Sequence, residues 1–254
     1  MTAVLTHSLD RSVVIRATRE TVFRFFTDPV RWAAWWGAGS TIDARPGGAM
    51  RIRYPDGTEA LGEVEEVSAP DRIVFTYGYA KGAPIPPGAS RVTIHVEAHD
   101  LGSRVRLVHA FTDRAVLDSH VQGWRYQLSL FGNVVANEAH AGAAALADRW
   151  LAAWSMADET ERRRTLDAIA LPAVQFGDRY SVIDGRDELI AHIDGAIRFM
   201  GGVRLERRGE VRHCLGTLLV DWTAVRNGQP FANGTSVFVL EAGGRIASVT
   251  GFWH

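Results

Sequence analysis

Residues 113–154 read DRAVLDSHVQGWRYQLSLFGNVVANEAHAGAAALADRWLAAW, and this stretch decides the fold. It reads as helix almost without interruption, and segments with the two-residue alternation of strands lie on both sides of it. The helical pattern is weakest between Asn137 and Gly142. We therefore predict two helices here, of which the first closes one domain and the second opens another.

The length and composition suit two small globular domains. The chain has 254 residues, of which 46% are hydrophobic and 22% charged, so it can bury a core. The net charge of −1 leaves no basic excess for binding nucleic acid. The single cysteine, Cys214, excludes an internal disulfide and a thiolate metal site. No segment reaches the ~18 apolar residues of a membrane span and no signal peptide is visible, so we expect a cytoplasmic protein.

The residues before the long helical stretch predict a strand, two short helices and a meander of antiparallel strands. Thr18 and Asp28 are suited to cap the two helices, and Gly37 to end the second. Alternating apolar and polar residues predict strands at about residues 50–54, 72–79, 91–99 and 104–110. One face of each strand is then buried, and the long helix closes this first domain.

Several motifs in this region, in their order along the chain, resemble the SRPBCC (START-like) superfamily. They are Ala17-Thr-Arg-Glu-Thr-Val-Phe, Asp28-Pro-Val-Arg-Trp, Trp35-Trp-Gly, Arg45-Pro-Gly-Gly and Gly123-Trp-Arg-Tyr-Gln-Leu. Within that superfamily they are most similar to the heat-shock-protein ATPase activator-like branch. The resemblance implies a helix-grip fold, in which a curved antiparallel sheet wraps around a long C-terminal helix and encloses an apolar cavity. We assign residues 1–139 to this domain.

The remaining residues predict two helices, a short strand pair, a third helix and four long antiparallel strands. The motifs Val174-Gln-Phe-Gly-Asp, Asp184-Gly-Arg-Asp-Glu-Leu-Ile-Ala-His-Ile and Gly244-Arg-Ile-Ala-Ser-Val-Thr-Gly-Phe-Trp resemble the SnoaL-like polyketide cyclase branch of the nuclear transport factor two-like fold. This implies a cone-shaped α+β barrel at residues 140–254, so the whole chain is a two-domain α+β protein. Such cones often pair their open sheets, which makes a homodimer through this sheet an expected possibility.

Three polar residues of the second domain are candidates for catalysis. The resemblance places Asp178 where enzymes of this fold carry a general base, just after the first short strand; the alternative is a solvated turn residue. His192, at the edge of the apolar face of its helix, could bond a ligand or transfer a proton, or could be a buried histidine bonded to a strand. His213, at a strand junction, is the third candidate.

Aromatic and polar residues of both domains are candidates for ligand binding, although most of the aromatic ones also suit a core. For the second domain they are Trp154, Trp222, Phe238 and Ser236; for the first, Trp35, Phe75, Tyr77, Trp124 and His109. Related isomerases carry an acidic oxyanion donor near the position of Ser236, and a serine hydroxyl is a weaker donor. The sequence departs here from the pattern of a steroid isomerase.

Three functional interpretations follow. The first is an enzyme that binds a small hydrophobic or aromatic molecule and catalyses cofactor-free acid–base chemistry on it, as a polyketide cyclase or isomerase does. The second is a non-catalytic ligand-binding or chaperone-accessory protein of the stress response. The third places chemistry in the first domain, around His109. The sequence has no phosphate-binding loop, dinucleotide fingerprint or zinc motif, so we expect no cofactor and no metal.

Overall fold

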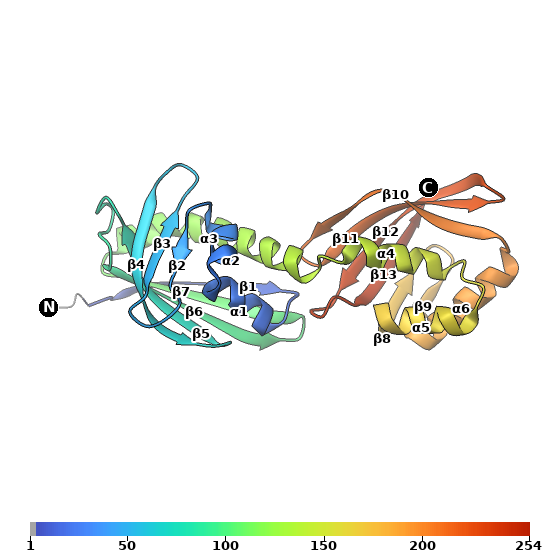
Figure 1. Cartoon of the computed structure of the whole chain (residues 1–254), viewed down its shortest axis with the longest axis horizontal. Helices are drawn as coiled ribbons and strands as arrows, with labels where there is room; N and C mark the ends of the chain where they lie inside the picture. The colour runs from blue at the N-terminus through green and yellow to red at the C-terminus, as the bar shows by residue number, and fades with distance from the viewer. Residues whose placement is uncertain (1–3) are drawn as a thin grey trace. The chain divides into compact units, whose positions relative to one another are not determined.

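A computed structural model describes residues 4–254 of the chain. The chain divides into two compact units, Met1–Ala136 (unit 1) and Asn137–His254 (unit 2). Each unit combines one sheet with helices, which confirms the predicted α+β class (Figure 1). The domain limits predicted from the sequence, 1–139 and 140–254, differ from this division by three residues and remain our proposal.

Unit 1 is built on one antiparallel sheet with the strand order β1-β7-β6-β5-β4-β3-β2. Its elements are β1 (His7–Ile15), α1 (Arg19–Thr27), α2 (Pro29–Trp36), β2 (Thr41–Ile42), β3 (Ala49–Arg53), β4 (Glu59–Ser68), β5 (Arg72–Tyr79), β6 (Ser90–His99), β7 (Gly102–Phe111) and α3 (Arg114–Ala139). Consecutive strands from β2 to β7 pair as a meander, and β1 pairs with β7. This order matches the helix-grip prediction.

The helix starts in unit 1 follow from their capping residues. The Thr18 hydroxyl accepts from the Thr21 N–H, and the Asp28 carboxylate accepts from the Val30 and Arg31 N–H groups. The apolar faces of α1 and α2 then pack on α3. The Phe26 and Phe131 rings stack with centroids 4.9 Å apart, which joins α1 to α3 inside the core.

Unit 2 is built on a mixed six-stranded sheet with the order β10-β11-β12-β13-β8-β9. Its elements are α4 (Ala143–Ala153), α5 (Glu159–Ile169), β8 (Ala170–Gly177), β9 (Val182–Asp184), α6 (Arg186–Phe199), β10 (Val203–Cys214), β11 (Thr217–Arg226), β12 (Gln229–Leu240) and β13 (Ile246–Trp253). β13 pairs with β8 in parallel, and the other pairs are antiparallel. Since β10 and β9 are its edges, the sheet is open and does not close into a barrel.

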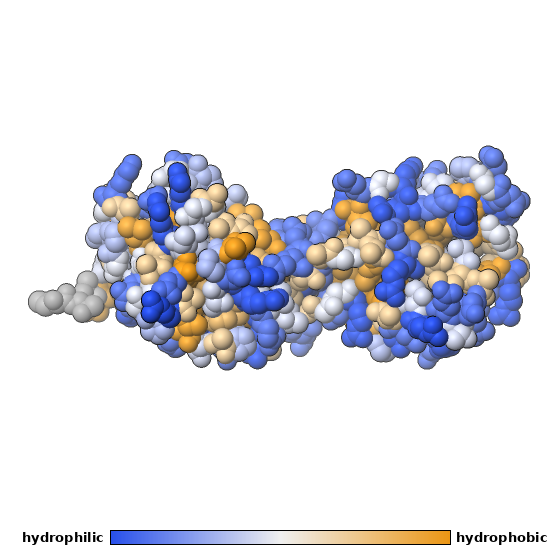
Figure 2. Space-filling view, viewed as in Figure 1, coloured by the Kyte–Doolittle hydropathy of each residue, from blue (hydrophilic) through white to orange (hydrophobic). Residues whose placement is uncertain are grey.

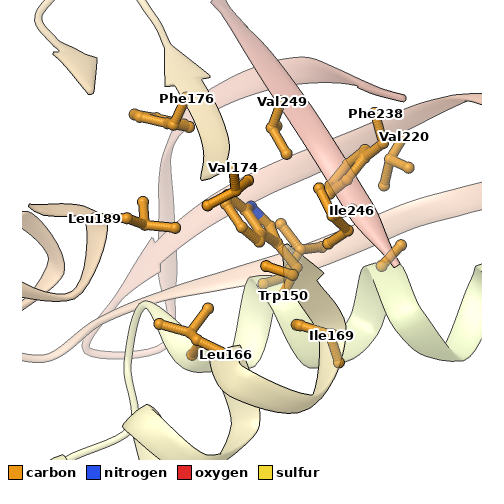
Figure 3. Close-up of a cluster of buried hydrophobic side chains, with 14 of the residues drawn as sticks. Trp150, Leu166, Ile169, Val174, Phe176, Leu189, Val220, Phe238, Ile246 and Val249 are labelled. Carbon is orange, nitrogen blue, oxygen red and sulfur yellow. The ribbon is translucent and has the colours of Figure 1, made fainter. Parts of the chain in front are cut away.

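The core of unit 2 lies between its helices and the inner face of the sheet (Figure 3). Side chains on β11 and β12 alternate between buried and half-exposed, so one face of each strand enters this core. Trp150 of α4 meets Phe238 of β12 edge to face, with ring centroids 5.8 Å apart. This packing holds α4 against the sheet and sets one wall of the site described below.

On the face seen in Figure 2, hydrophilic side chains cover much of each unit, with hydrophobic groups between them. Within residues 4–254, no helix combines the length and the apolar character needed to cross a membrane.

Candidate functional site

Unit 2 contains a pocket of about 290 Å³, which we call the unit 2 pocket. Residues of α4, α6, β8, β10, β11, β12 and β13 contribute to it, together with neighbouring loop residues. Its wall is mainly apolar and includes Trp150, Leu151, Trp154, Phe176, Ile197, Met200, Val203, Leu205, Trp222, Phe231 and Trp253. The polar members include Asp178, Ser236, Ser155 and Arg204. An apolar pocket with few polar groups is typical of a small-molecule site.

Asp178 places a carboxylate in the unit 2 pocket. It follows β8 directly, and its Oδ1 accepts from the Tyr180 N–H at 2.8 Å while its Oδ2 accepts from Trp253 Nε1–H at 3.1 Å. Both donors are uncharged, and the side chain forms no ion pair with residues 4–254. The two bonds orient the carboxylate, and each oxygen keeps a lone pair for a further proton or donor.

Ser236 supplies a hydroxyl group to the same pocket. Trp222 Nε1–H donates to its Oγ at 3.0 Å, so this indole uses the oxygen as an acceptor. The hydroxyl's own proton has no acceptor among the described residues. Because Ser236 lines the pocket, that proton is available to a molecule inside it.

Asp178 and Ser236 both lie close to Gly251. A Cβ atom at this position would lie 3.3 Å from Asp178 Cβ and 4.0 Å from Ser236 Oγ. The carboxylate and the hydroxyl therefore border one small space that a side chain at residue 251 would partly fill. A base and a neutral hydrogen-bond donor stand together there, which is the pair of groups that removing a proton beside a carbonyl requires.

The two predicted catalytic histidines do not line the unit 2 pocket. His192 Nε2 lies 3.3 Å from Ser181 Oγ, and its ring packs on Trp154 and Phe176, with centroids 5.8 and 6.1 Å away. It therefore lies behind two aromatic residues of the wall.

His213 belongs to a separate cluster. Its Nε2 accepts from the Gly216 N–H at 3.0 Å, so Nδ1 carries the proton and donates to Asn137 Oδ1 at 2.8 Å. Burial, and then the neighbouring His140, lower the pKa of His213. The neutral form suits these bonds, which hold His213 in a structural contact.

The predicted ligand-binding residues of the second domain divide into two groups. Trp154, Trp222 and Ser236 line the unit 2 pocket. Phe238 is 0% exposed, packs on Trp150 and does not line it. The alternation along β12 marked Phe238 as inward, but the depth at which it lies depends on α4, which covers it.

Unit 1 contains a second hollow of about 360 Å³, which we call the unit 1 cavity. Its lining is rich in aromatic residues of α2, β5 and α3 and of the loop after β3: Trp35, Trp36, Tyr54, Tyr77, Tyr79, Trp124 and Tyr126. Three predicted residues, Trp35, Tyr77 and Trp124, are among them. Phe75 is instead fully buried against Trp32, with ring centroids 5.8 Å apart.

His109 is buried within a closed set of hydrogen bonds in unit 1 and does not line the unit 1 cavity. Trp124 Nε1–H donates to its Nδ1 at 2.9 Å. Ser90 gives its proton to the Tyr77 carbonyl at 2.8 Å, so His109 Nε2–H donates to Ser90 Oγ, also at 2.8 Å. Burial, and then the neighbouring His120, lower the pKa of His109 well below its usual value. Both ring nitrogens are occupied and the ring is neutral.

The histidine that lines the unit 1 cavity is His120 of α3, which the sequence analysis missed. Its Nδ1–H donates to the Val116 carbonyl at 2.7 Å, and its Nε2 lies 3.3 Å from the Tyr79 hydroxyl, which donates to it. Burial lowers the pKa of His120. A sequence signal existed, because His120 precedes Trp124 by four residues and so shares its face of the helix.

No metal centre is visible in the described part of the chain. Across residues 4–254, no group of three or more His, Cys, Asp or Glu side chains could hold a metal ion.

Comparison with known proteins supports the assignment of the first unit. Residues 16–136 match the family model of "Activator of Hsp90 ATPase homolog 1-like protein", as the motifs of the first domain predicted. No curated protein matches the chain.

Similar solved structures each cover about half of the chain. A candidate isomerase of the SnoaL-like family from Agrobacterium tumefaciens is 25% identical, covers 46% of this chain and 98% of its own, and has a TM-score of 0.43. CalU16 from Micromonospora echinospora is 23% identical, with 52% and 76% coverage and a TM-score of 0.41. The Aha1 dimer from Colwellia psychrerythraea is 13% identical, with 48% and 91% coverage and a TM-score of 0.43.

Proposed function

We propose that this chain, whose residues 16–136 match the model of the Activator of Hsp90 ATPase homolog 1-like family, binds a small uncharged carbonyl compound in the unit 2 pocket and moves a proton on it. The observation that carries the proposal is the position of Asp178 and Ser236 on either side of Gly251 in an apolar wall. The reaction class is isomerisation or cyclisation without a cofactor.

Asp178 acts as the general base in the proposed reaction. Its carboxylate takes a proton from the carbon next to the substrate carbonyl, and the electron pair of that C–H bond moves toward the carbonyl oxygen. Ser236 Oγ–H donates to the oxygen as it becomes negative. In an isomerisation of a β,γ-unsaturated carbonyl compound, the protonated Asp178 then returns the proton to the γ carbon of the dienolate, and the double bond moves into conjugation with the re-formed carbonyl. In a cyclisation, the enolate carbon instead attacks a second carbonyl carbon of the same molecule, and the protonated Asp178 gives its proton to the alkoxide that forms there.

The apolar wall contributes to this reaction by excluding water. Because apolar side chains make up most of the pocket wall, a bound substrate meets few water molecules beside the Asp178 carboxylate. His192 and His213 have no proton-transfer role in this scheme because neither lines the pocket. His192 instead supports the wall through Trp154 and Phe176.

The alternative function is ligand binding without chemistry, as in a carrier or a chaperone-accessory protein. The unit 1 cavity favours it for that unit, because no carboxylate is among its lining residues. A homodimer through the unit 2 sheet and a cytoplasmic location remain predictions beside both functions.

The proposal can be tested without the natural substrate by hydrogen–deuterium exchange on 2-tetralone, a neutral bicyclic aromatic ketone. We expect the chain to accelerate exchange of the protons beside the carbonyl in D₂O, followed by nuclear magnetic resonance. Asp178→Asn removes the base, and general-base catalysis of this kind contributes roughly 10²–10⁴-fold. The protein-dependent exchange rate should fall by at least a hundredfold.

Asp184→Asn is the matched control, since Asp184 is an exposed carboxylate of β9 outside the pocket. It should leave exchange unchanged. If 2-tetralone binds but is not exchanged by the wild-type chain, or if Asp178→Asn exchanges it at the wild-type rate, the catalytic proposal is wrong. Binding without exchange would favour the carrier function.

A further inference from the structure

The unit 1 cavity has features of a second binding site, independent of the reaction proposed for unit 2. We propose that it binds an uncharged planar aromatic molecule bearing a hydroxyl group, such as a neutral phenol, with Gln127 accepting the hydroxyl proton. Three features of the cavity support this: its aromatic walls, one acceptor that has no hydrogen-bond partner among the described residues, and a lining without charged side chains.

The walls suit a planar ring. The Trp35 and Trp36 rings lie 4.2 Å apart by centroid, and Trp36 meets Trp124 edge to face at 5.6 Å. Trp36 also meets Tyr54 at 5.9 Å with an interplanar angle of 90°. Indole and phenol rings offer large rigid surfaces, and aromatic pairs gain from offset or edge-to-face contact beyond simple burial. An aromatic ligand is therefore favoured over an aliphatic chain of equal volume.

Gln127 of α3 provides the unpaired acceptor. It is only 7% exposed, and its side-chain amide N–H donates to the Trp35 carbonyl, which fixes which end of the amide is oxygen. The amide oxygen has no hydrogen-bond partner among the described residues, although Gln127 lines the cavity. The oxygen is therefore free to accept a hydrogen bond from a ligand O–H inside the cavity.

The phenols of the cavity keep it neutral. The Tyr54 and Tyr77 hydroxyls share a hydrogen bond of 2.9 Å, and burial is the main cause that raises the pKa of both above the usual value. Both therefore stay protonated at neutral pH, and a negative charge is disfavoured beside them. Their oxygens can also accept from, or donate to, a second polar group of the ligand.

Charged ligands lack a partner here. No Asp, Glu, Lys or Arg is among the lining residues, and the only imidazole, that of His120, has a pKa lowered by burial. An anion would be desolvated without a cation beside it. A quaternary ammonium ion could contact the aromatic faces, but it would leave the Gln127 oxygen without a hydrogen-bond donor.

The test compares four probes by isothermal titration calorimetry on the full chain: 2-naphthol, naphthalene, 2-naphthoate and phenyltrimethylammonium. We expect 2-naphthol to bind at least tenfold more tightly than the other three. Gln127→Met keeps the length and the apolar body of the side chain but removes the acceptor, so it should weaken 2-naphthol binding about tenfold and leave naphthalene binding within a factor of two. Tyr54→Phe provides a second variant, expected to weaken 2-naphthol several-fold.

Gln122→Met is the matched control, because Gln122 lies on the exposed side of α3 and does not line the cavity. It should change no affinity. Tighter binding of 2-naphthoate or phenyltrimethylammonium, or 2-naphthol binding that Gln127→Met and Tyr54→Phe leave unchanged, would overturn the proposal. Exchange of 2-tetralone by the Gln127→Met variant should equal that of the wild type, which separates this site from the reaction proposed for unit 2.

Discussion

The unit 1 cavity and the unit 2 pocket have similar volumes and aromatic walls, but their polar groups differ in kind. In the unit 1 cavity, hydroxyls and an imidazole bond to one another and are neutral. In the unit 2 pocket, a carboxylate is oriented by two uncharged donors and has no ion-pair partner among the described residues. Aromatic lining predicts a ligand in both places. Only an oriented carboxyl group that can still accept a proton points to acid–base chemistry.

The sharpest test of this comparison is to break the internal bonding of unit 1 at His109. His109→Phe fills the space but removes the acceptor of Trp124 Nε1–H, which is then buried without a partner. Such a loss costs roughly 1–3 kcal/mol of unfolding free energy. Hydrogen exchange of α3 and β7 peptides, read by mass spectrometry, should rise accordingly.

The matched variant in unit 2 is His192→Phe. His192 is half-buried, and its side chain makes one long hydrogen bond, of 3.3 Å, with Ser181. We expect it to change exchange in unit 2 by less than about 1 kcal/mol. Equal losses for the two histidines would contradict the view that only His109 belongs to a closed hydrogen-bond set.

The stability of unit 1 as a function of pH tests whether its buried histidines are neutral in the folded state. The folded-state pKa of His109 lies well below 6.5, and that of His120 is also lowered. Below pH 6.5 the unfolded chain binds protons that folded unit 1 does not, so unfolding becomes easier as pH falls. The stability that comes from keeping these histidines neutral is fully present above pH 6.5. As the pH falls below 6.5, one fully shifted histidine lowers the unfolding free energy by about 1.4 kcal/mol per pH unit, until the pH reaches its pKa in the folded state.

Hydrogen exchange in α3 and β7 between pH 7.5 and 5.5, corrected for the chemical rate, measures this slope. His109→Phe should remove part of it. A flat profile for the wild-type chain over that range would show that these histidines are protonated in the folded state, against the neutral unit 1 cavity described above.

The smallest expected effect concerns the geometry of the unit 2 pocket. Gly251→Ala adds a methyl group 3.3 Å from Asp178 Cβ, so the carboxylate must shift by a few tenths of an ångström. We expect 2-tetralone exchange to slow about fivefold, equivalent to about 1 kcal/mol. Gly195→Ala on α6, where the new Cβ meets nothing within 4 Å, should leave the rate unchanged. If Gly251→Ala also has no effect, the carboxylate position is not critical.

Most of the fold could be predicted from the sequence because its signals are local. The caps at Thr18 and Asp28 and the alternation along β6 and β7 depend on neighbouring residues alone. The mixed strand pairing in the sheet of unit 2 could not be predicted in the same way. It depends on the parallel pairing of β13 with β8, which brings together segments about 75 residues apart.

The candidate site was predicted less completely, for a related reason. Asp178 was selected because its motif, Val174-Gln-Phe-Gly-Asp, resembles the SnoaL-like branch, whose enzymes carry a general base just after this strand. The alternation along a strand shows which residues point inward but not how deeply they are buried. Phe75 and Phe238 were therefore predicted to line a cavity, although packing places both in the core. His109 and His120 show the same limit, since only tertiary contacts decide which histidine is enclosed by donors and which reaches the cavity.

The bond between His213 and Asn137 has a practical consequence for dividing the gene. A recombinant fragment starting at residue 140 would lack the amide oxygen that accepts from His213 Nδ1 at 2.8 Å. Truncation there would expose a polar ring that the intact chain satisfies. A fragment of the second unit should therefore begin upstream of Asn137, inside the last turns of α3, so that the excised piece retains its own N-terminal anchor.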